Sequence, residues 1–129
     1  MQVNRGNNMT MDFFFPDDLA PRQTPEETRI TSLSAEPYPD GRRIRVNIEI
    51  TPFQKRPHID VTLFDSDGAE AGATSFIEPL TWKLEFTLHI RGRETVVGAY
   101  RLEARLYYPD GPSAEPFNYE FEIPADGLN

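Results

Sequence analysis

Apolar and polar side chains alternate along much of this chain. The clearest run covers residues 43–50, where isoleucine or valine fills every second position and arginine, asparagine or glutamate the positions between. Comparable runs occupy residues 82–91, 100–108 and 117–123, and a shorter one occupies residues 59–63. A period of two is typical of strands with one buried and one solvated face, which is the usual pattern of antiparallel sheets.

Two further stretches fit a strand less regularly. Residues 30–38 change face partway, which predicts a β-bulge, and residues 69–77 are rich in small side chains, which favours an edge strand. Since no helical pattern of useful length occurs, we predict an all-β, seven-stranded antiparallel sandwich of two sheets. Its strands are expected at residues 29–37, 42–51, 58–64, 70–77, 81–91, 97–108 and 117–124.

Three tetrapeptides lie between these predicted strands. Tyr-Pro-Asp-Gly occurs at residues 38–41 and again at 108–111, and Asp-Ser-Asp-Gly occurs at 65–68. Proline at the second place followed by Asp-Gly favours a tight turn, so each copy is predicted to reverse the chain between strands. The residues around the two copies do not match, and the copies are therefore not an internal repeat.

The inward positions of the predicted strands define the expected core. Its members are Ile44, Val46, Ile48, Val61, Leu63, Trp82, Leu84, Phe86, Leu88, Leu102, Leu106, Tyr119 and Phe121.

The run VVGAYRLEARLYYPDG, residues 96–111, resembles the sixth strand of immunoglobulin-like and fibronectin type III-like domains. A Gly-x-Tyr-x-apolar pattern carries the tyrosine corner there, and Gly98, Tyr100 and Leu102 match it. The resemblance covers residues 28–124 in strand number and spacing, and it implies a backbone hydrogen bond from Tyr100. The chain departs from the family in lacking a cysteine pair and in placing Trp82 on the fifth strand. It is also similar over its whole length to uncharacterised bacterial proteins, which implies no known activity.

The first 24 residues differ in composition from the rest. They are rich in Asn, Asp, Pro and Gln with little periodicity, so we predict a flexible tail at 1–24 and a sandwich domain at 25–129. Three consecutive phenylalanines, Phe13, Phe14 and Phe15, interrupt this polar tail. Two hypotheses remain open for them, because they could cover their own sandwich or anchor in a partner's groove.

Length and charge narrow the function classes. A chain of 129 residues is the size of one domain, and its net charge of −8 disfavours binding to nucleic acid or to an anionic membrane. The chain has no cysteine, which excludes disulfides and zinc–thiolate sites. No signal peptide or membrane span is recognisable, so a cytoplasmic location is the default expectation.

Catalytic and metal motifs are missing as well. No serine lies in a GxSxG elbow, His58 and His89 lie in no zinc-binding spacing, and residues 65–68 do not fit a calcium loop. We therefore expect no catalytic residue, metal or cofactor, and we expect the protein not to be an enzyme.

In an immunoglobulin-like topology, the loops after the second, fourth and sixth strands share one end. These are residues 51–57, 78–80 and 109–116, and loops on a rigid scaffold are where binding usually occurs. Phe53 is alternatively a plug for the core. The predicted partner-binding residues are Phe13, Phe14, Phe15, Phe53, Lys55, Arg56, His58, Tyr107 and Asp110.

These features favour a non-catalytic protein-interaction or scaffold module with an unknown protein partner. The alternative is a small-ligand or carbohydrate-binding sandwich that uses the same end, at the loops after the second and sixth strands. An enzyme accessory domain or hydrolase comes third. A single sugar-stacking platform is disfavoured, because the outward aromatics Phe64 and Tyr107 should lie at opposite ends of their sheet. Self-association through the tail or an edge strand is the further partner hypothesis.

Overall fold

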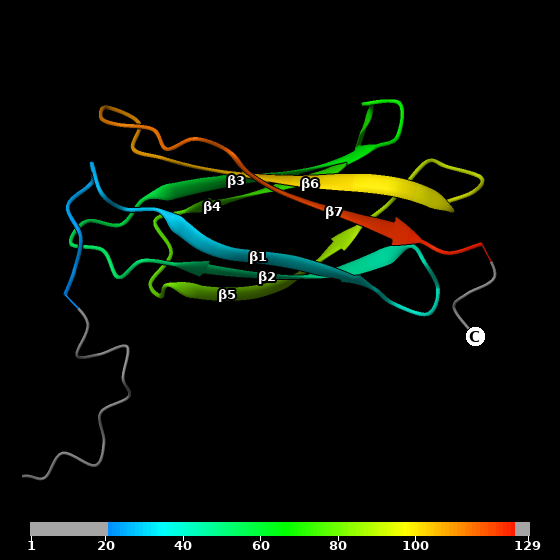
Figure 1. The fold of residues 1–129 in the computed structure, drawn as a ribbon, viewed down its shortest axis with the longest axis horizontal. Coiled ribbons are helices and arrows are strands. Elements are labelled where there is room, and N and C mark those ends of the chain that lie inside the picture. Colours follow the sequence, from blue (N-terminus) through cyan, green and yellow to red (C-terminus); the bar gives the residue numbers. More distant parts are fainter. Residues whose placement is uncertain (1–20, 126–129) are drawn as a thin grey trace, which may run out of the picture.

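The computed structural model describes residues 21–125, in which seven antiparallel strands form two facing sheets (Figure 1). One sheet has the order β1-β2-β5 and the other the order β4-β3-β6-β7. The strands are β1 (Ile30–Pro37), β2 (Arg43–Ile50), β3 (His58–Asp65), β4 (Glu70–Ile77), β5 (Lys83–His89), β6 (Gly98–Tyr107) and β7 (Phe117–Ile123). The all-β sandwich and its seven strands are therefore confirmed. Among these residues no helix is long and apolar enough to cross a membrane.

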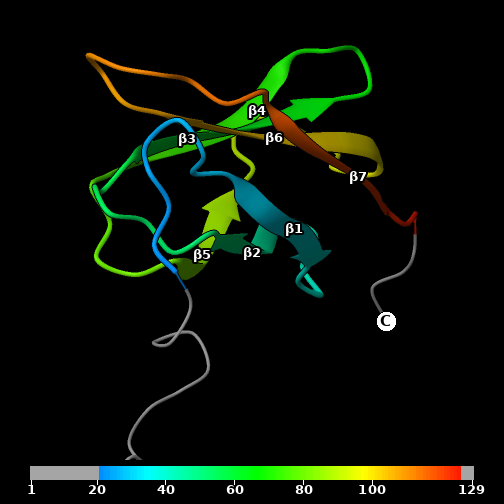
Figure 2. The same ribbon diagram turned by 60° about the vertical axis from the view of Figure 1, so that its left-hand side comes forward.

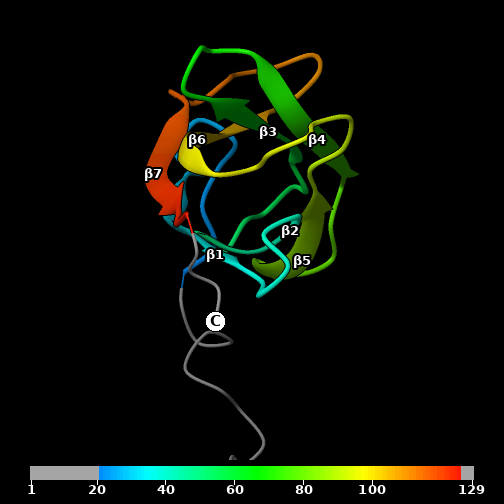
Figure 3. The same ribbon diagram turned by 90° about the vertical axis from the view of Figure 1, so that its right-hand side faces the viewer.

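Figure 3 shows the two sheets as layers, with β1 and β7 along one open side and β4 and β5 along the other. The predicted edge position of β4 is confirmed. The predicted bulge is confirmed too, because the register of β1 on β2 shifts between Ile30 and Ser32. This extra residue keeps both Ile30 and Leu33 on the buried face.

The three tetrapeptides form the predicted turns. The Gly41 amide donates to the Tyr38 carbonyl over 2.8 Å, and the Gly68 amide donates to the Asp65 carbonyl over 2.9 Å. Both glycines have a positive φ, 69° and 83°, which is a backbone conformation that residues with a side chain rarely adopt. The second Tyr-Pro-Asp-Gly copy closes in the same way, from the Gly111 amide to the Tyr108 carbonyl over 2.9 Å.

The core lies between the sheets. The predicted core residues on β2, β3 and β6 are buried, and so is Leu88. The prediction overestimated burial on the edge strands, because an edge strand is covered by a neighbour on one side only. Five predicted core residues are therefore only partly buried: Trp82, Leu84, Phe86, Tyr119 and Phe121.

Tyr100 joins the start of β6 to the loop before it. Its hydroxyl donates to the Val96 backbone carbonyl over 2.8 Å in a buried position, which confirms the predicted hydrogen bond. Burial raises the pKa of this hydroxyl above its ordinary value of 10.0.

Residues 1–20 and 126–129 lie outside the described residues, and with them Phe13, Phe14, Phe15 and most of the predicted tail. The described part of that tail contacts the sandwich at Gln23. Its amide donates to the Pro52 carbonyl over 2.8 Å, and its own carbonyl accepts from the Gln54 amide over 2.9 Å.

Candidate functional site

Three loops meet at one end of the sandwich, as the topology predicts (Figures 1 and 2). We call this the loop end and define it by residues 51–57, 78–82 and 108–116. The Glu78 amide donates to the Pro57 carbonyl over 3.1 Å, and the Arg56 guanidinium lies 3.9 Å from the Glu78 carboxylate. The first two loops are thus joined directly.

Tyr108 ties the third loop to the first. Its hydroxyl donates to the Lys55 backbone carbonyl over 2.7 Å and lies 3.3 Å from the Thr28 hydroxyl oxygen. Thr28 is fully buried and donates in turn to the Thr24 carbonyl. Sequence reasoning missed Tyr108, although continuing the alternation of β6 by one residue beyond the outward Tyr107 would have placed it inward.

Phe53 closes the core at the loop end. Only 5% of its surface is exposed, and its ring meets the edge of the Trp82 ring with 5.5 Å between centroids. The Arg22 guanidinium lies over the Trp82 ring at 5.5 Å from its centroid. Of the two sequence-based readings of Phe53, the structure supports the plug, and this side chain offers little surface to a partner.

A row of three side chains crosses the outer face of the four-stranded sheet at this end. The strand register pairs His58 with Ile77 on one side and with Tyr107 on the other. The His58 and Tyr107 rings are in edge contact at 5.4 Å, and Ile77 is 65% exposed. We call Ile77, His58 and Tyr107 the outer strip.

The connector from β4 to β5 continues this surface. Glu78 has a φ of 53°, which is the only positive value outside glycine among the described residues, and Leu80 is 82% exposed. Sequence reasoning missed Ile77 and Leu80. The signal was present, because two adjacent bulky residues at 76–77 cannot both face inward, and Leu80 follows a proline between two strands.

The charged residues predicted here lie around this surface. Arg56 pairs with Glu78, whereas Lys55 enters the hydrogen-bond network through its backbone carbonyl. Lys55 and Arg56 are both exposed, and so is Asp110 in the turn after β6. The structure thus brings together His58, Tyr107, Arg56 and the Lys55 backbone, while Asp110 stays at the rim.

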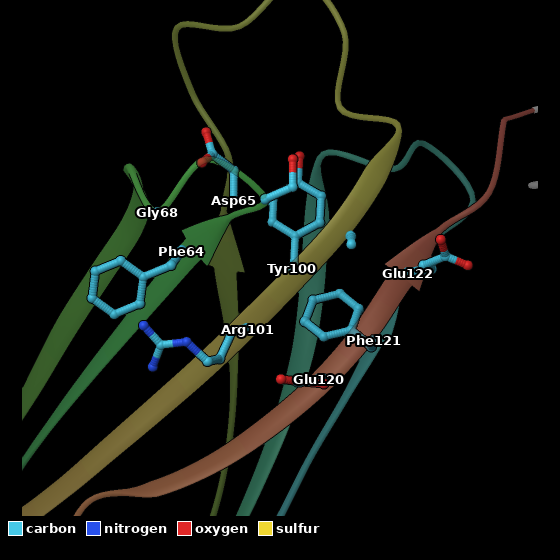
Figure 4. A pocket seen from close by; sticks show the side chains of 10 residues that line it. Phe64, Asp65, Gly68, Tyr100, Arg101, Glu120, Phe121 and Glu122 are labelled. Atoms are coloured by element: carbon cyan, nitrogen blue, oxygen red, sulfur yellow. The ribbon is translucent and has the colours of Figure 1, made fainter.

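A separate groove of about 740 Å³ lies at the opposite end, next to Phe64 (Figure 4). The register pairs Phe64 with Arg101 and His58 with Tyr107, so Phe64 and Tyr107 do lie at opposite ends of the sheet. The Arg101 guanidinium covers the Phe64 ring at 4.5 Å and donates to the Asn118 side chain over 2.7 Å. Arg101 therefore occupies a face of Phe64 on which a sugar ring could otherwise stack.

Asp65, one of the carboxylates that line the groove, also has internal partners. Asp65 accepts from the Ala69 amide over 2.9 Å and pairs with Arg93 over 2.6 Å. The Ala69 hydrogen bond, followed by that of Arg93, holds the pKa of Asp65 below its ordinary value of 3.8. These contacts stabilise the turn after β3. Within residues 21–125, no three acidic or histidine side chains gather closely enough to hold a metal ion.

Replacing Tyr108 with phenylalanine should lower the free energy of unfolding by about 1 kcal/mol at neutral pH, because the Lys55 carbonyl loses its donor. Burial raises the pKa of the Tyr108 hydroxyl above its ordinary value of 10.0, so its contribution is complete below pH 10.0 and is lost as the pH rises through the folded-state pKa. The difference in free energy of unfolding between the wild type and the Tyr108→Phe variant should therefore become smaller in alkaline solution. Urea unfolding at neutral pH and above pH 10.0 measures this difference. An equal difference at both pH values would contradict the role given to the Tyr108 hydroxyl.

No family model matches this chain, and no curated protein is similar enough to match it. Among solved structures, Lactobacillus rhamnosus β-glucuronidase aligns with a TM-score of 0.48 and 14% identity. Ruminococcus gnavus β-glucuronidase in complex with uronic deoxynojirimycin aligns with a TM-score of 0.48 and 16% identity. Both matches cover 76% of this chain but only 16% of the glucuronidase chain. A likeness this weak carries no argument about activity.

Proposed function

We propose that this domain is a non-catalytic protein-interaction module that binds a partner through its loop end. The observation that carries the proposal is the pair Ile77 and Leu80, at the end of β4 and in the connector after it, which are 65% and 82% exposed. Large apolar side chains gathered on an exposed surface often mark a contact site.

The backbone between these two residues supports the same reading. Glu78 holds a positive φ that L-residues rarely adopt, and such local strain is concentrated at functional positions. The Pro57 carbonyl and the Arg56 guanidinium fix Glu78 from the neighbouring loop. A connector already fixed in this way loses less conformational entropy when it binds, which favours affinity.

The surroundings indicate the chemistry of the partner. Ile77 and Leu80 suit an apolar depression, and the outer strip adds the amphipathic rings of His58 and Tyr107, which are common at interfaces. The exposed Lys55 and Arg56 favour carboxylates at the rim of the partner surface. The net charge of −8 limits how acidic the whole partner can be.

We further propose that the sandwich is immunoglobulin-like, of the fibronectin type III-like kind. Support comes from the Tyr100–Val96 hydrogen bond, which has the form of a tyrosine corner, and from the three loops that share an end. The fourth strand differs from the constant-type immunoglobulin arrangement, because β4 pairs with β3 and not with the sheet of β1, β2 and β5.

The alternative, a small-ligand or carbohydrate-binding sandwich, has less support. Sugar binding usually uses aromatic rings with a free face, but Arg101 covers Phe64 at the far end. At the loop end, Phe53 is buried and offers no ring face to a sugar. The loop end therefore favours a protein contact over a sugar platform.

The double substitution Ile77→Ser/Leu80→Ser tests the proposal. Immobilised protein should capture a discrete partner from an extract of the source cells, and that partner is then titrated against each purified variant. Burial of one such side chain contributes about 1.5–3 kcal/mol, so the double variant should bind at least about tenfold more weakly.

Val97→Ser is the matched control. Val97 is also an exposed apolar residue, at 47%, but it precedes β6 at the end opposite the loop end. This variant should bind like the wild type, and both variants should melt like it because surface substitutions change stability by about 0.5 kcal/mol or less. Equal affinity of the double variant and the wild type would refute the loop end as the binding surface.

A further inference from the structure

The backbone of β4 has an outward edge that pairs with no strand among residues 21–125. The Glu78 amide donates to the Pro57 carbonyl, so the hydrogen-bonded pairs of β3 and β4 fall at every second residue counted back from Glu78. The residues between these pairs are Ala73, Ser75 and Ile77. Their N–H and C=O groups therefore point away from β3, where another strand can pair with them.

Only the half of β4 nearer the loop end is accessible along this edge. An added Cβ at Gly72 would lie 3.0 Å from the His89 carbonyl oxygen, because the end of β5 comes close at that point. The Glu70 carbonyl accepts from the Arg93 guanidinium over 3.0 Å. The accessible part thus consists of residues 73–77, and we call it the β4 edge.

The β4 edge lacks the features that normally prevent sheet edges from pairing. Such edges usually carry charged side chains or proline, and residues 71–77 contain neither. Charged side chains lie on each of the other outermost strands: Glu36 in β1, Lys83 and Glu85 in β5, and Glu120 and Glu122 in β7. Since the chain has a net charge of −8, two copies meet the least repulsion at an uncharged edge.

We propose that two copies of this domain associate through the β4 edge, as antiparallel strands related by a two-fold axis. Such an interface uses the same surface of both copies, so that every contact occurs twice. Pairing the outward groups sets Ser75 opposite Ser75 of the second copy and Ile77 opposite its Ala73. This register uses all three outward residues and none of the covered ones.

The side chains at the β4 edge suit this register. On the outer face, Ile77 is 65% exposed and would lie beside the small, exposed Ala73 of the second copy. On the inner face, the partly buried Phe76 would lie beside Thr74, which is also partly buried. Each copy would thus cover its larger apolar side chains with smaller ones of the other.

The charges at the two ends of the β4 edge are complementary as well. Lys55 and Arg56 are exposed at the loop end and outnumber Glu78 there, whereas Asp67 and Glu70 are exposed at the opposite end of β4. An antiparallel pairing brings the basic end of one copy to the acidic end of the other, twice in each dimer.

The strand pairing does not involve Leu80, His58 or Tyr107, so the inference goes beyond the proposed function and does not rest on it. Because the two copies are antiparallel, their loop ends would lie at opposite ends of the dimer. One dimer would then present two separate loop ends to partners.

Sedimentation equilibrium of the full-length chain over a range of concentrations tests the proposal. The wild type should change from the mass of one chain to that of two as concentration rises. Ser75→Lys and Ser75→Glu should each raise the dissociation constant at least about tenfold, because two like charges then lie opposite each other across the axis. An equal mixture of the two variants should dimerise again, since lysine then faces glutamate.

Ser32→Lys is the matched control, because Ser32 is an exposed serine on β1, another outermost strand. This variant should dimerise like the wild type. The Ser75 hydroxyl donates to Asp60 of its own copy over 2.7 Å, so circular dichroism must show that each variant keeps the fold. In the unaltered protein, the amides of residues 73, 75 and 77 should exchange more slowly with solvent as concentration rises.

A wild type with the mass of one chain at every concentration would overturn the proposal, as would equal dissociation constants for Ser75→Lys and the wild type. A mixture of the two charged variants that stays monomeric would overturn the Ser75 register and the proposal with it. If the β4 amides gain protection only when a loop-end partner is added, the edge binds a strand of that partner, and the second copy is ruled out. None of these results changes the partner titration of Ile77→Ser/Leu80→Ser, so the proposed function stands or fails separately.

Discussion

Replacing Leu102 with alanine should lower the free energy of unfolding by about 2–5 kcal/mol. Leu102 is fully buried on β6, where the register sets it between Leu63 of β3 and Tyr119 of β7. Removing its side-chain carbons loses their transfer free energy and leaves a cavity that a close-packed core fills only in part. Small domains are stable by about 5–15 kcal/mol, so this one change removes a large fraction of the total.

Leu80→Ala is the control, because it makes the same chemical change at a side chain that is 82% exposed. Its effect should stay within about 0.5 kcal/mol. Urea unfolding followed by circular dichroism measures both variants under the same conditions. Similar losses in the two variants would contradict the described burial of these leucines.

Gly72→Val should destabilise the sandwich by about 1–3 kcal/mol, through a different mechanism. The new Cβ would lie 3.0 Å from the His89 carbonyl oxygen, and backbone atoms cannot move aside as a flexible side chain can. The two γ-carbons of valine add further crowding, so β4 and β5 must separate. This separation would also widen the open side near Phe86.

Ala73→Val provides the comparison at the next residue of the same strand. Ala73 is exposed, and valine favours strands, so this change should be neutral or slightly stabilising. Thermal melting of both variants measures the difference. If Gly72→Val melted at or above the temperature of Ala73→Val, the close approach of β4 to β5 would be wrong.

The strands could be predicted from the sequence because a period of two reports directly which residues face a core. Residues 43–50 alternate without exception, and β2 alternates between exposed and buried in the same way. The hydrogen bond of Tyr100 was implied by the resemblance of residues 96–111 to a strand that carries a tyrosine corner, and it reaches four residues back to Val96. The bulge in β1 was predictable because the pattern itself changes face.

The degree of burial was not predictable, because it depends on which strands lie at sheet edges. Leu84 and Leu88 belong to the same alternating run, yet only Leu88 is buried. That difference depends on how close β4 comes to β5, which is a property of the assembled sheets.

That the three loops share one end could be predicted, but the contacts within the loop end could not. The position of the loop end follows from strand order, whereas the burial of Phe53 and the contact of Tyr108 with Lys55 depend on distant segments meeting. The positive φ of Glu78 leaves no mark in the sequence either, because glutamate is not a residue that favours it.

The two buried tyrosines of β6 have a consequence for how the domain opens. Tyr100 fastens the strand near its start to Val96, and Tyr108 fastens the chain just after its end to Lys55. Between these points β6 pairs with β3 on one side and with β7 on the other. Local opening proceeds in cooperative units, and the units with the fewest partners open first. Partial unfolding should therefore begin at the edge strands, each of which pairs with one neighbour, and reach β6 last. The strands β3 and β6 should then form the slowest-exchanging unit and the last native pairing to be lost.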